Sequence, residues 1–539
     1  MFRHSSSPIH TLPVELLSHV FQLATHDRPE ESDDCPPFNS ESVLAPLTFA
    51  AVCRHWRTVA LNTASLYTSI CITPELLRES ELDLRGIAAY LELSRNYALD
   101  ILIDARDQDW DFDDEGMYTP WFTSQHMEDS MAVLLPHIDR WRSLCIFTDV
   151  STPMHHALRA FEAKLLAGSN ASRLESMRLM RCDAYAAYGE PESTYPFLSA
   201  LPTDRSPVFP HLRHLALRGV SAAWLPLAAQ LPTSLRSFEL AYLPTSVQPT
   251  LSELALMLQH TPDLERLTLN AAGPHCSQQQ TDVILELPQL SSLHLGYTCI
   301  SAASALLHLL SAANPKIHVI TLEDASDPAS FVPVDAGPVL SFLFPSASER
   351  PFTKLRNVTL RRVCASASAL EVPADVAILD RLELVGTSKT LFALGRAARH
   401  VCARGVFVGP FSDAARRVEI PDWVEYAARR LVETQTPRLV EVFEEVHAEP
   451  ESQMVEEWKM GETRVRVARM VMPSESEPSS DEDEDEEASS VGSSESDGAD
   501  SDWMPFGSSS SQPRSLITML TLPGLSGMLG GSMVVRVRM

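Results

Sequence analysis

The chain has 539 residues, of which 45% are hydrophobic, enough to bury a sizeable core in several domains. Lys and Arg number 43 against 71 Asp and Glu, and the net charge of −28 disfavours proteins that bind nucleic acid or anionic membranes through a basic surface. Nine cysteines without a Cys-x-x-Cys pair disfavour a disulfide scaffold or zinc ribbon and favour reduced thiols, as in the cytoplasm or nucleus.

Residues 12–24, LPVELLSHVFQLA, predict a short amphipathic helix. Pro13 suits the first helical turn, where its missing N–H costs no hydrogen bond. Apolar residues recur at every fourth position in two adjacent rows, which gives the helix a broad apolar stripe. The rows are Leu12, Leu16 and Val20, and beside them Leu17 and Phe21.

Residues 44–72 continue the helical pattern after a polar insert at 25–42. Pro46 again marks a start, and the next apolar residues fall at helical spacing. These residues are Phe49, Val52, Cys53, Trp56 and Ala60. Neither helix is long enough to bury its stripe on the other, so we expect a further partner surface, inside the chain or outside it.

Residues 73–140 combine helix and strand patterns and are predicted to be a linking segment. They contain an acidic loop at 107–115, whose acids Asp111, Asp113, Asp114 and Glu115 lie between Trp110 and Trp121. The loop lacks the glycine and terminal glutamate of an EF-hand, so we interpret it as a solvated loop rather than a calcium site.

An internal repeat occupies residues 141–410. Eight segments show an apolar residue, a second one three positions on, and Leu two positions after that, and their starts lie 23 to 38 residues apart. A ninth, degenerate copy is Trp141/Leu144/Ile146. The eight segments are Leu174/Met177/Leu179, Leu212/Leu215/Leu217, Leu235/Phe238/Leu240, Leu264/Leu267/Leu269, Leu290/Leu293/Leu295, Ile317/Ile320/Leu322, Leu355/Val358/Leu360 and Leu379/Leu382/Leu384.

Each segment predicts a half-buried strand, because its last two apolar residues share one face and the residue between them points the other way. Helical patterns at 251–260 and 302–312, each followed closely by proline, alternate with the strands. This order predicts a curved solenoid whose strands line the inner face, the natural binding surface of such a fold, although the residues there select no class of ligand. The candidate target-binding residues are Arg178, Arg218, Glu239, Thr268, His294, Thr321, Glu323, Thr359, Arg361 and Glu383. The alternative is a generic α/β domain with similar strands.

The C-terminal part divides at about residue 473. Residues 411–472 show helical patterns, although the alternation at 464–467 also suits a strand. Residues 473–539 are predicted to be a disordered acidic tail, since 474–502 hold thirteen Asp or Glu and no Lys or Arg. Serines followed three positions on by an acid, such as Ser474 and Ser479, suggest phosphorylation sites, and a spacer role is an equal alternative.

The N-terminal blocks resemble the F-box, the module that docks substrate receptors on the Skp adaptor of SCF ubiquitin ligases. The likeness is carried by Leu12-Pro13-x-Glu15-Leu16, by Val20-Phe21, and by Val52-Cys53-Arg54-x-Trp56-Arg57. The organisation is similar to that of fungal, basidiomycete-type F-box proteins, in which the box precedes an irregular leucine-rich-repeat array. The polar insert is longer than the family's usual link, and Tyr67 stands where the family often has Trp. The fold class that follows is α/β: an F-box three-helix module at 1–72, then a solenoid.

The resemblance implies a non-catalytic adaptor that binds a Skp-type protein, through it a cullin, and an unknown protein target. It implies that the adaptor contacts are Leu12, Pro13, Leu16, Val20 and Phe21, with Val52 and Trp56 shared with the local core. The alternatives are that these helices only cap the solenoid, and that the chain is a leucine-rich scaffold without a ligase role.

Sequence patterns of catalysis and cofactor binding are lacking. The chain contains no GxxxxGK[ST], GxGxxG, HExxH or GxSxG pattern, and we expect no cofactor and no metal. Cys53 lies in the apolar stripe, which indicates a buried side chain rather than an activated thiolate. The N-terminus has no hydrophobic signal core, and the most apolar stretch, at 300–313, is too short to span a bilayer.

Overall fold

The structure is a computed structural model. The described residues are 9, 12–26, 38–78, 81–107, 121–182, 195–202, 207–275, 285–313, 316–326, 334–345, 351–366, 379–407, 439–447, 454–460 and 463–472. The predicted acidic loop lies mostly outside them, and the predicted acidic tail lies entirely outside them.

Short helices form a module at the N-terminal end. They are α1 (Val14–Thr25), η2 (Ser40–Leu44), α2 (Ala45–Val52), α3 (Arg54–Asn62) and η3 (Ala64–Tyr67). Pro13 precedes α1 as its N-cap residue, and Pro46 lies in the first turn of α2, as predicted. The Cys53 Sγ accepts a hydrogen bond from the backbone N–H of Trp56 at 3.5 Å, which marks the start of α3.

One long sheet follows, and in the described part of the chain it has fifteen strands in the order β1-β4-β5-β6-β7-β8-β9-β10-β11-β12-β13-β14-β15-β17-β16. Neighbouring strands are parallel except β16 and β17. The strands are β1 (Ser69–Ile72), β4 (Leu99–Asp104), β5 (Trp141–Thr148), β6 (Ser176–Arg181), β7 (His214–Arg218), β8 (Ser237–Ala241), β9 (Arg266–Asn270), β10 (Ser292–Tyr297), β11 (Val319–Asp324), β12 (Asn357–Arg361), β13 (Leu379–Ser388), β14 (Ala398–Phe407), β15 (Leu439–His447), β16 (Met454–Met460) and β17 (Thr463–Met472). A separate small hairpin pairs β2 (Leu77–Arg78) with β3 (Glu81–Leu82).

Helices cover one face of this sheet. They are α4 (Arg85–Leu93), α5 (Ser124–Leu134), η5 (Leu135–Arg140), α6 (Ser151–Leu166), α7 (Trp224–Gln230), α8 (Leu251–Gln259), α9 (Ile300–Ala313), α10 (Gly337–Leu343) and η8 (Lys389–Ala397), with short turns η4 (Pro74–Leu76) and η6 (Thr245–Val247). The predicted helices at 251–260 and 302–312 are α8 and α9. Thr250 and Glu253 form a reciprocal capping box that starts α8.

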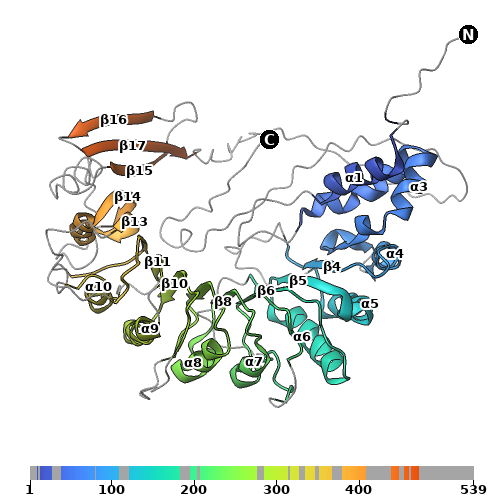
Figure 1. Ribbon diagram of the computed structural model, residues 1–539, viewed down its shortest axis with the longest axis horizontal. Coiled ribbons are helices and arrows are strands. Elements are labelled where there is room, and N and C mark those ends of the chain that lie inside the picture. The colour runs from blue at the N-terminus through green and yellow to red at the C-terminus, as the bar shows by residue number, and fades with distance from the viewer. Residues whose placement is uncertain are drawn as a thin grey trace, which may run out of the picture.

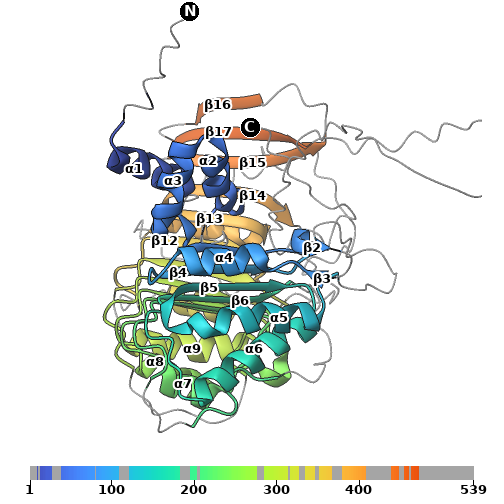
Figure 2. The ribbon, with the colours of Figure 1, turned by 90° about the vertical axis from the view of Figure 1, so that its right-hand side faces the viewer.

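The sheet is curved into an arch (Figure 1). Its strands lie on the inner side and α5 to α10 on the outer side, with α1 to α3 at one end and β13 to β17 at the other. Figure 2, turned by 90°, shows the strands stacked side by side along the arch. One continuous hydrophobic core runs from Leu17 in α1 to Ala403 in β14.

The eight predicted repeat strands are β6 to β13, and their anchors are in register. Met177 pairs with Leu215, Leu215 with Phe238, and so on through Ile320, Val358 and Leu382. The degenerate ninth copy is β5, whose Leu144 pairs with Met177. The strand prediction for this part of the chain is therefore confirmed, and its order is that of a solenoid.

Two predicted boundaries differ from the structure. The sheet already begins at β1 and includes β4, so residues 73–140 are not a mere link. The helical prediction for 411–472 is wrong for its described part, which forms β15, β16 and β17. The sequence alternates there with period two, as at Val440 and Val442 or Val465 and Val467, and this alternation suits a strand better than a helix.

Candidate functional site

Helix α1 carries apolar side chains on two faces. Leu17 and Phe21 are buried, with 0% and 1% of their surface exposed. Leu16, Val20 and Leu23, which are spaced three or four residues apart, are 53%, 47% and 63% exposed. Such spacing places the three on one side of a helix. One face of α1 therefore holds the module together, and the other presents apolar surface outward.

Aromatic packing explains why Phe21 lies inside. Its ring stacks on Phe49 of α2 with centroids 4.3 Å apart and contacts Trp56 of α3 at 5.0 Å. The three helices meet at this cluster, in which Trp56 is half-buried. The sequence prediction placed Phe21 among the adaptor contacts, but the structure makes it a core residue, because the row that includes Leu17 faces inward.

The other predicted adaptor contacts are at least partly accessible. Val52 is 55% exposed at the end of α2, Pro13 is exposed, and Leu12 is half-buried before α1. Sequence reasoning missed further exposed apolar residues in the module. They are Val14, Leu23, Leu44, Leu47 and Leu61. Exposed apolar side chains gathered on one small unit are typical of protein-interaction surfaces.

The candidate target-binding residues all lie on strands β6 to β13. Those between two buried anchors form one aligned row, from Arg178 through Glu239, Thr268, His294, Thr321 and Thr359 to Glu383, with Ala216 between the first two. The residues on either side of each member are buried between the sheet and the helices. Because successive side chains of a strand point to opposite faces, this row faces the inner side of the arch. Arg218, Glu323 and Arg361 stand two positions further along their strands.

Charged members of this inner face contact one another. Arg218 Nε lies 2.5 Å from Glu239 Oε1, and Glu383 lies 3.6 Å from Arg381 and 3.5 Å from Arg404. Glu323 was predicted as a candidate contact, yet it is only 4% exposed. Its carboxylate accepts hydrogen bonds from Arg362 at 3.1 Å and His294 at 3.3 Å. These partners belong to the same sheet, so the carboxylate is not available to contact a target. The uncharged threonines stay half-buried in the middle of the face.

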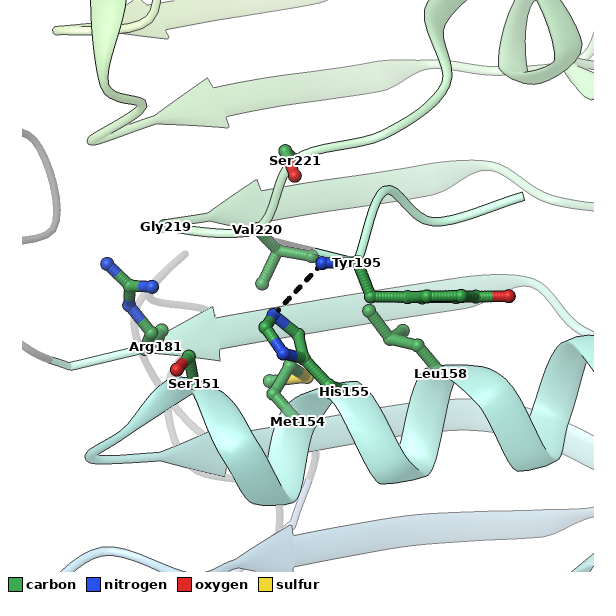
Figure 3. Close-up of a pocket in the computed structure, with 9 residues that line it drawn as sticks. All are labelled: Ser151, Met154, His155, Leu158, Arg181, Tyr195, Gly219, Val220 and Ser221. Atoms are coloured by element: carbon green, nitrogen blue, oxygen red, sulfur yellow. Dashed lines mark hydrogen bonds between the residues drawn. The ribbon is translucent and has the colours of Figure 1, made fainter. Parts of the chain in front are cut away.

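A small hollow lies at the carboxyl ends of β6 and β7, beside the first turns of α6 (Figure 3). The backbone N–H of Tyr195 donates to His155 Nε2 at 3.3 Å across its floor. Arg181 and Ser151 line the same hollow. Because it has room for roughly one water molecule, it does not suit a metabolite.

Burial keeps several thiols in the described residues protonated, although Cys53, which the sequence predicts to be buried, is only half-buried at the start of α3. Burial raises the pKa of Cys71, Cys145 and Cys182 to about 12, which opposes thiolate formation at neutral pH. Within the same described residues, no group of three His, Cys, Asp or Glu side chains is placed to hold a metal ion. In that part of the chain no helix has both the length and the apolar character needed to cross a membrane.

Comparison with known families finds a match at the N-terminal end of the chain. A family model described as F-box-like covers residues 9–73, which is the helical module together with β1. Domains of this family typically bind Skp-type adaptors and are generally non-catalytic. A search of curated proteins found no match. The chain therefore contains an F-box-like domain at the end of a long parallel sheet.

Proposed function

We propose that the chain is the target-recognition subunit of an SCF-type ubiquitin ligase, acting in the cytoplasm or nucleus. The F-box-like module binds the Skp adaptor and through it the cullin. The arch is an irregular leucine-rich-repeat array whose inner face holds a protein target. A tethered target meets the transfer site at high effective concentration, so the chain needs no catalytic residues of its own.

One observation carries this proposal. The F-box-like match coincides with a helix, α1, that keeps Leu16 and Val20 exposed after its other face is buried. Complete burial of one such side chain contributes about 1.5–3 kcal/mol, and a few anchors of this kind supply most of the affinity at typical interfaces. A helix that served only as a cap would have no need of this second apolar face.

A scaffold without ligase assembly is the second candidate. It is favoured by the way the module closes the end of the sheet, since Tyr90 of α4 donates a hydrogen bond to the Val43 carbonyl at 2.6 Å. A solenoid requires such an end cap. The exposed face of α1 distinguishes the candidates, because only docking uses it.

The test is the affinity of the full chain for a Skp adaptor, compared between the wild type and L16D/V20D. Both positions are about half exposed, so the variant should fold like the wild type and yet lose affinity by roughly 100-fold or more. The matched control is Leu225→Asp, an equally exposed leucine on α7 outside the module, which should bind normally.

Adaptor binding that survives in L16D/V20D would show that α1 is not the docking surface. If the folded wild-type chain binds no Skp adaptor, the ligase role is contradicted and the scaffold remains. Circular dichroism of each variant establishes that lost binding does not reflect lost structure.

A further inference from the structure

Three arginines gather on the inner face near the C-terminal end of the arch. Arg361, Arg381 and Arg404 lie on the adjacent strands β12, β13 and β14, and we call them the arginine triplet. All three are exposed, Arg381 and Arg404 with side chains 44% and 46% accessible. The carboxylate among them, Glu383, contacts both Arg381 and Arg404.

The rest of the inner face is also rich in arginine. On the described inner-face positions of β6 to β14, arginines outnumber carboxylates by six to three. The arginines are Arg178, Arg218, Arg266, Arg361, Arg381 and Arg404, and the carboxylates are Glu239, Glu323 and Glu383. Each of these carboxylates contacts an arginine. The stretch of the inner face from β6 to β14 therefore carries a net positive charge in a chain whose net charge is −28, whereas β4 adds Asp100 and Asp104 at the far end of the arch.

The same chain contains an acidic segment whose negative charge is complementary to the arginines of this face. Residues 481–487 are seven consecutive acids, and they lie outside the described residues. Eight residues separate them from Met472, the last residue of β17, and such a spacer extends over up to about 30 Å. At a strand spacing of about 4.8 Å, β14 lies roughly 10 Å and β12 roughly 19 Å from β17.

The strand register also places the arginine triplet within reach of the chain that follows β17. Arg361 and Arg404 are level with Ala468 of β17, four residues or roughly 13 Å before Met472. The spacer can therefore run back along the sheet to both arginines, and the acidic run extends from there toward Arg381, which is level with Arg464. A short tether raises the effective concentration of the acidic run near the face to about the millimolar range. At that effective concentration, a few weak ion pairs are enough to keep the acidic run bound to the arginines.

We propose that the acidic segment at 474–502 docks on the arginine triplet and occupies the inner face of the arch. The segment then competes with any anionic ligand for that face. This proposal is independent of adaptor docking, because α1 to α3 lie at the opposite end of the arch (Figure 1).

The test uses the full chain and a fluorescent peptide with the sequence of residues 474–502. In one variant, the seven acids at 481–487 are replaced by Asn and Gln in the full chain. Fluorescence anisotropy at low salt should show this neutral-run chain binding the peptide at least about tenfold more tightly than the wild type, whose own segment occupies the face.

Adding Arg361→Gln, Arg381→Gln and Arg404→Gln to the neutral-run chain should weaken peptide binding by about tenfold or more. The matched control removes three exposed arginines elsewhere, with Arg85→Gln, Arg173→Gln and Arg236→Gln, and should bind as before. Equal affinity of wild-type and neutral-run chains would overturn the proposal. So would equal losses in the two triple variants, which would indicate attraction by overall charge alone.

Discussion

Glu323 is a buried carboxylate on an otherwise solvated strand face. Burial alone raises the pKa of such a group, but the hydrogen bond with His294 and the charges of Arg362 and Arg361 more than offset it. The pKa of Glu323 therefore lies below its ordinary value. Removing one partner of a buried pair leaves the other unsatisfied, so the cluster stabilises β10 to β12 only as a whole.

The substitution Glu323→Gln should lower the free energy of unfolding by about 1–3 kcal/mol at pH 7. Because the folded pKa is depressed, the stability that Glu323 contributes is present above its unfolded pKa of about 4.3 and is lost as pH falls through the folded value. Urea unfolding at pH 7 and pH 3 should thus show a difference that shrinks in acid.

The control for this change is Glu383→Gln, because the side chain of Glu383 is more exposed and its ion pairs are 3.5 and 3.6 Å long. Such a pair contributes less than about 1 kcal/mol. A penalty for Glu323→Gln that is the same at both pH values would contradict the assigned charge state of Glu323.

At the scale of elements, Arg140 fixes the end of α4 against β5. Its guanidinium donates to the Leu91 carbonyl at 3.2 Å, the Tyr97 carbonyl at 3.1 Å and Ser94 Oγ at 2.6 Å. Leu91 lies in the last turn of α4, where carbonyls lack helical partners and a cation is favoured. Arg140 is 6% exposed, so these bonds replace most of its hydration.

We expect Arg140→Met to destabilise the protein by about 2–4 kcal/mol, because the apolar stem fits but the Tyr97 carbonyl and Ser94 Oγ lose the guanidinium, and the Leu91 carbonyl keeps only the Ser94 hydroxyl as a side-chain donor. Thermal unfolding followed by circular dichroism measures the loss. Arg173→Met, which removes a single hydrogen bond from an exposed arginine to the Asn96 carbonyl, should cost under about 1 kcal/mol. Equal shifts in melting temperature for the two variants would rule out a special role for Arg140.

Strands β6 to β13 could be predicted because each has Leu at its last anchor. Strands β1 and β4 pair in the same register, but their anchors are Ile70 and Ile72, and Ile101 and Ile103, so a pattern that requires Leu misses them. The site was predicted less well. Leu16 and Leu17 belong to adjacent apolar rows, and nothing in their spacing tells which row packs on Phe49 and Trp56.

At the scale of the whole molecule, the F-box-like module and the sheet share one core. Tyr90 of α4 connects them, because its ring contacts Tyr67 edge-on at 5.0 Å and its hydroxyl donates to Val43 of η2. Gln22 of α1 also donates to Ser65 at 2.7 Å. A protein that docks on α1 to α3 is therefore held rigidly relative to the strands, as a receptor that positions its target requires.

Tyr90→Phe tests this connection, because it removes only the hydroxyl that donates to Val43 and keeps the ring. Leaving that buried carbonyl unpaired should cost about 1–3 kcal/mol. In a solenoid each repeat contacts its neighbours, so the loss should spread from the module into the adjoining strands and fade along the array. The rate of amide hydrogen exchange should therefore rise in α1 to α3, β1 and β4. In β10 and the strands beyond it, the rate should equal that of the wild type. Acceleration confined to α1 to α3 would show that the module opens by itself and is not rigidly connected to the strands.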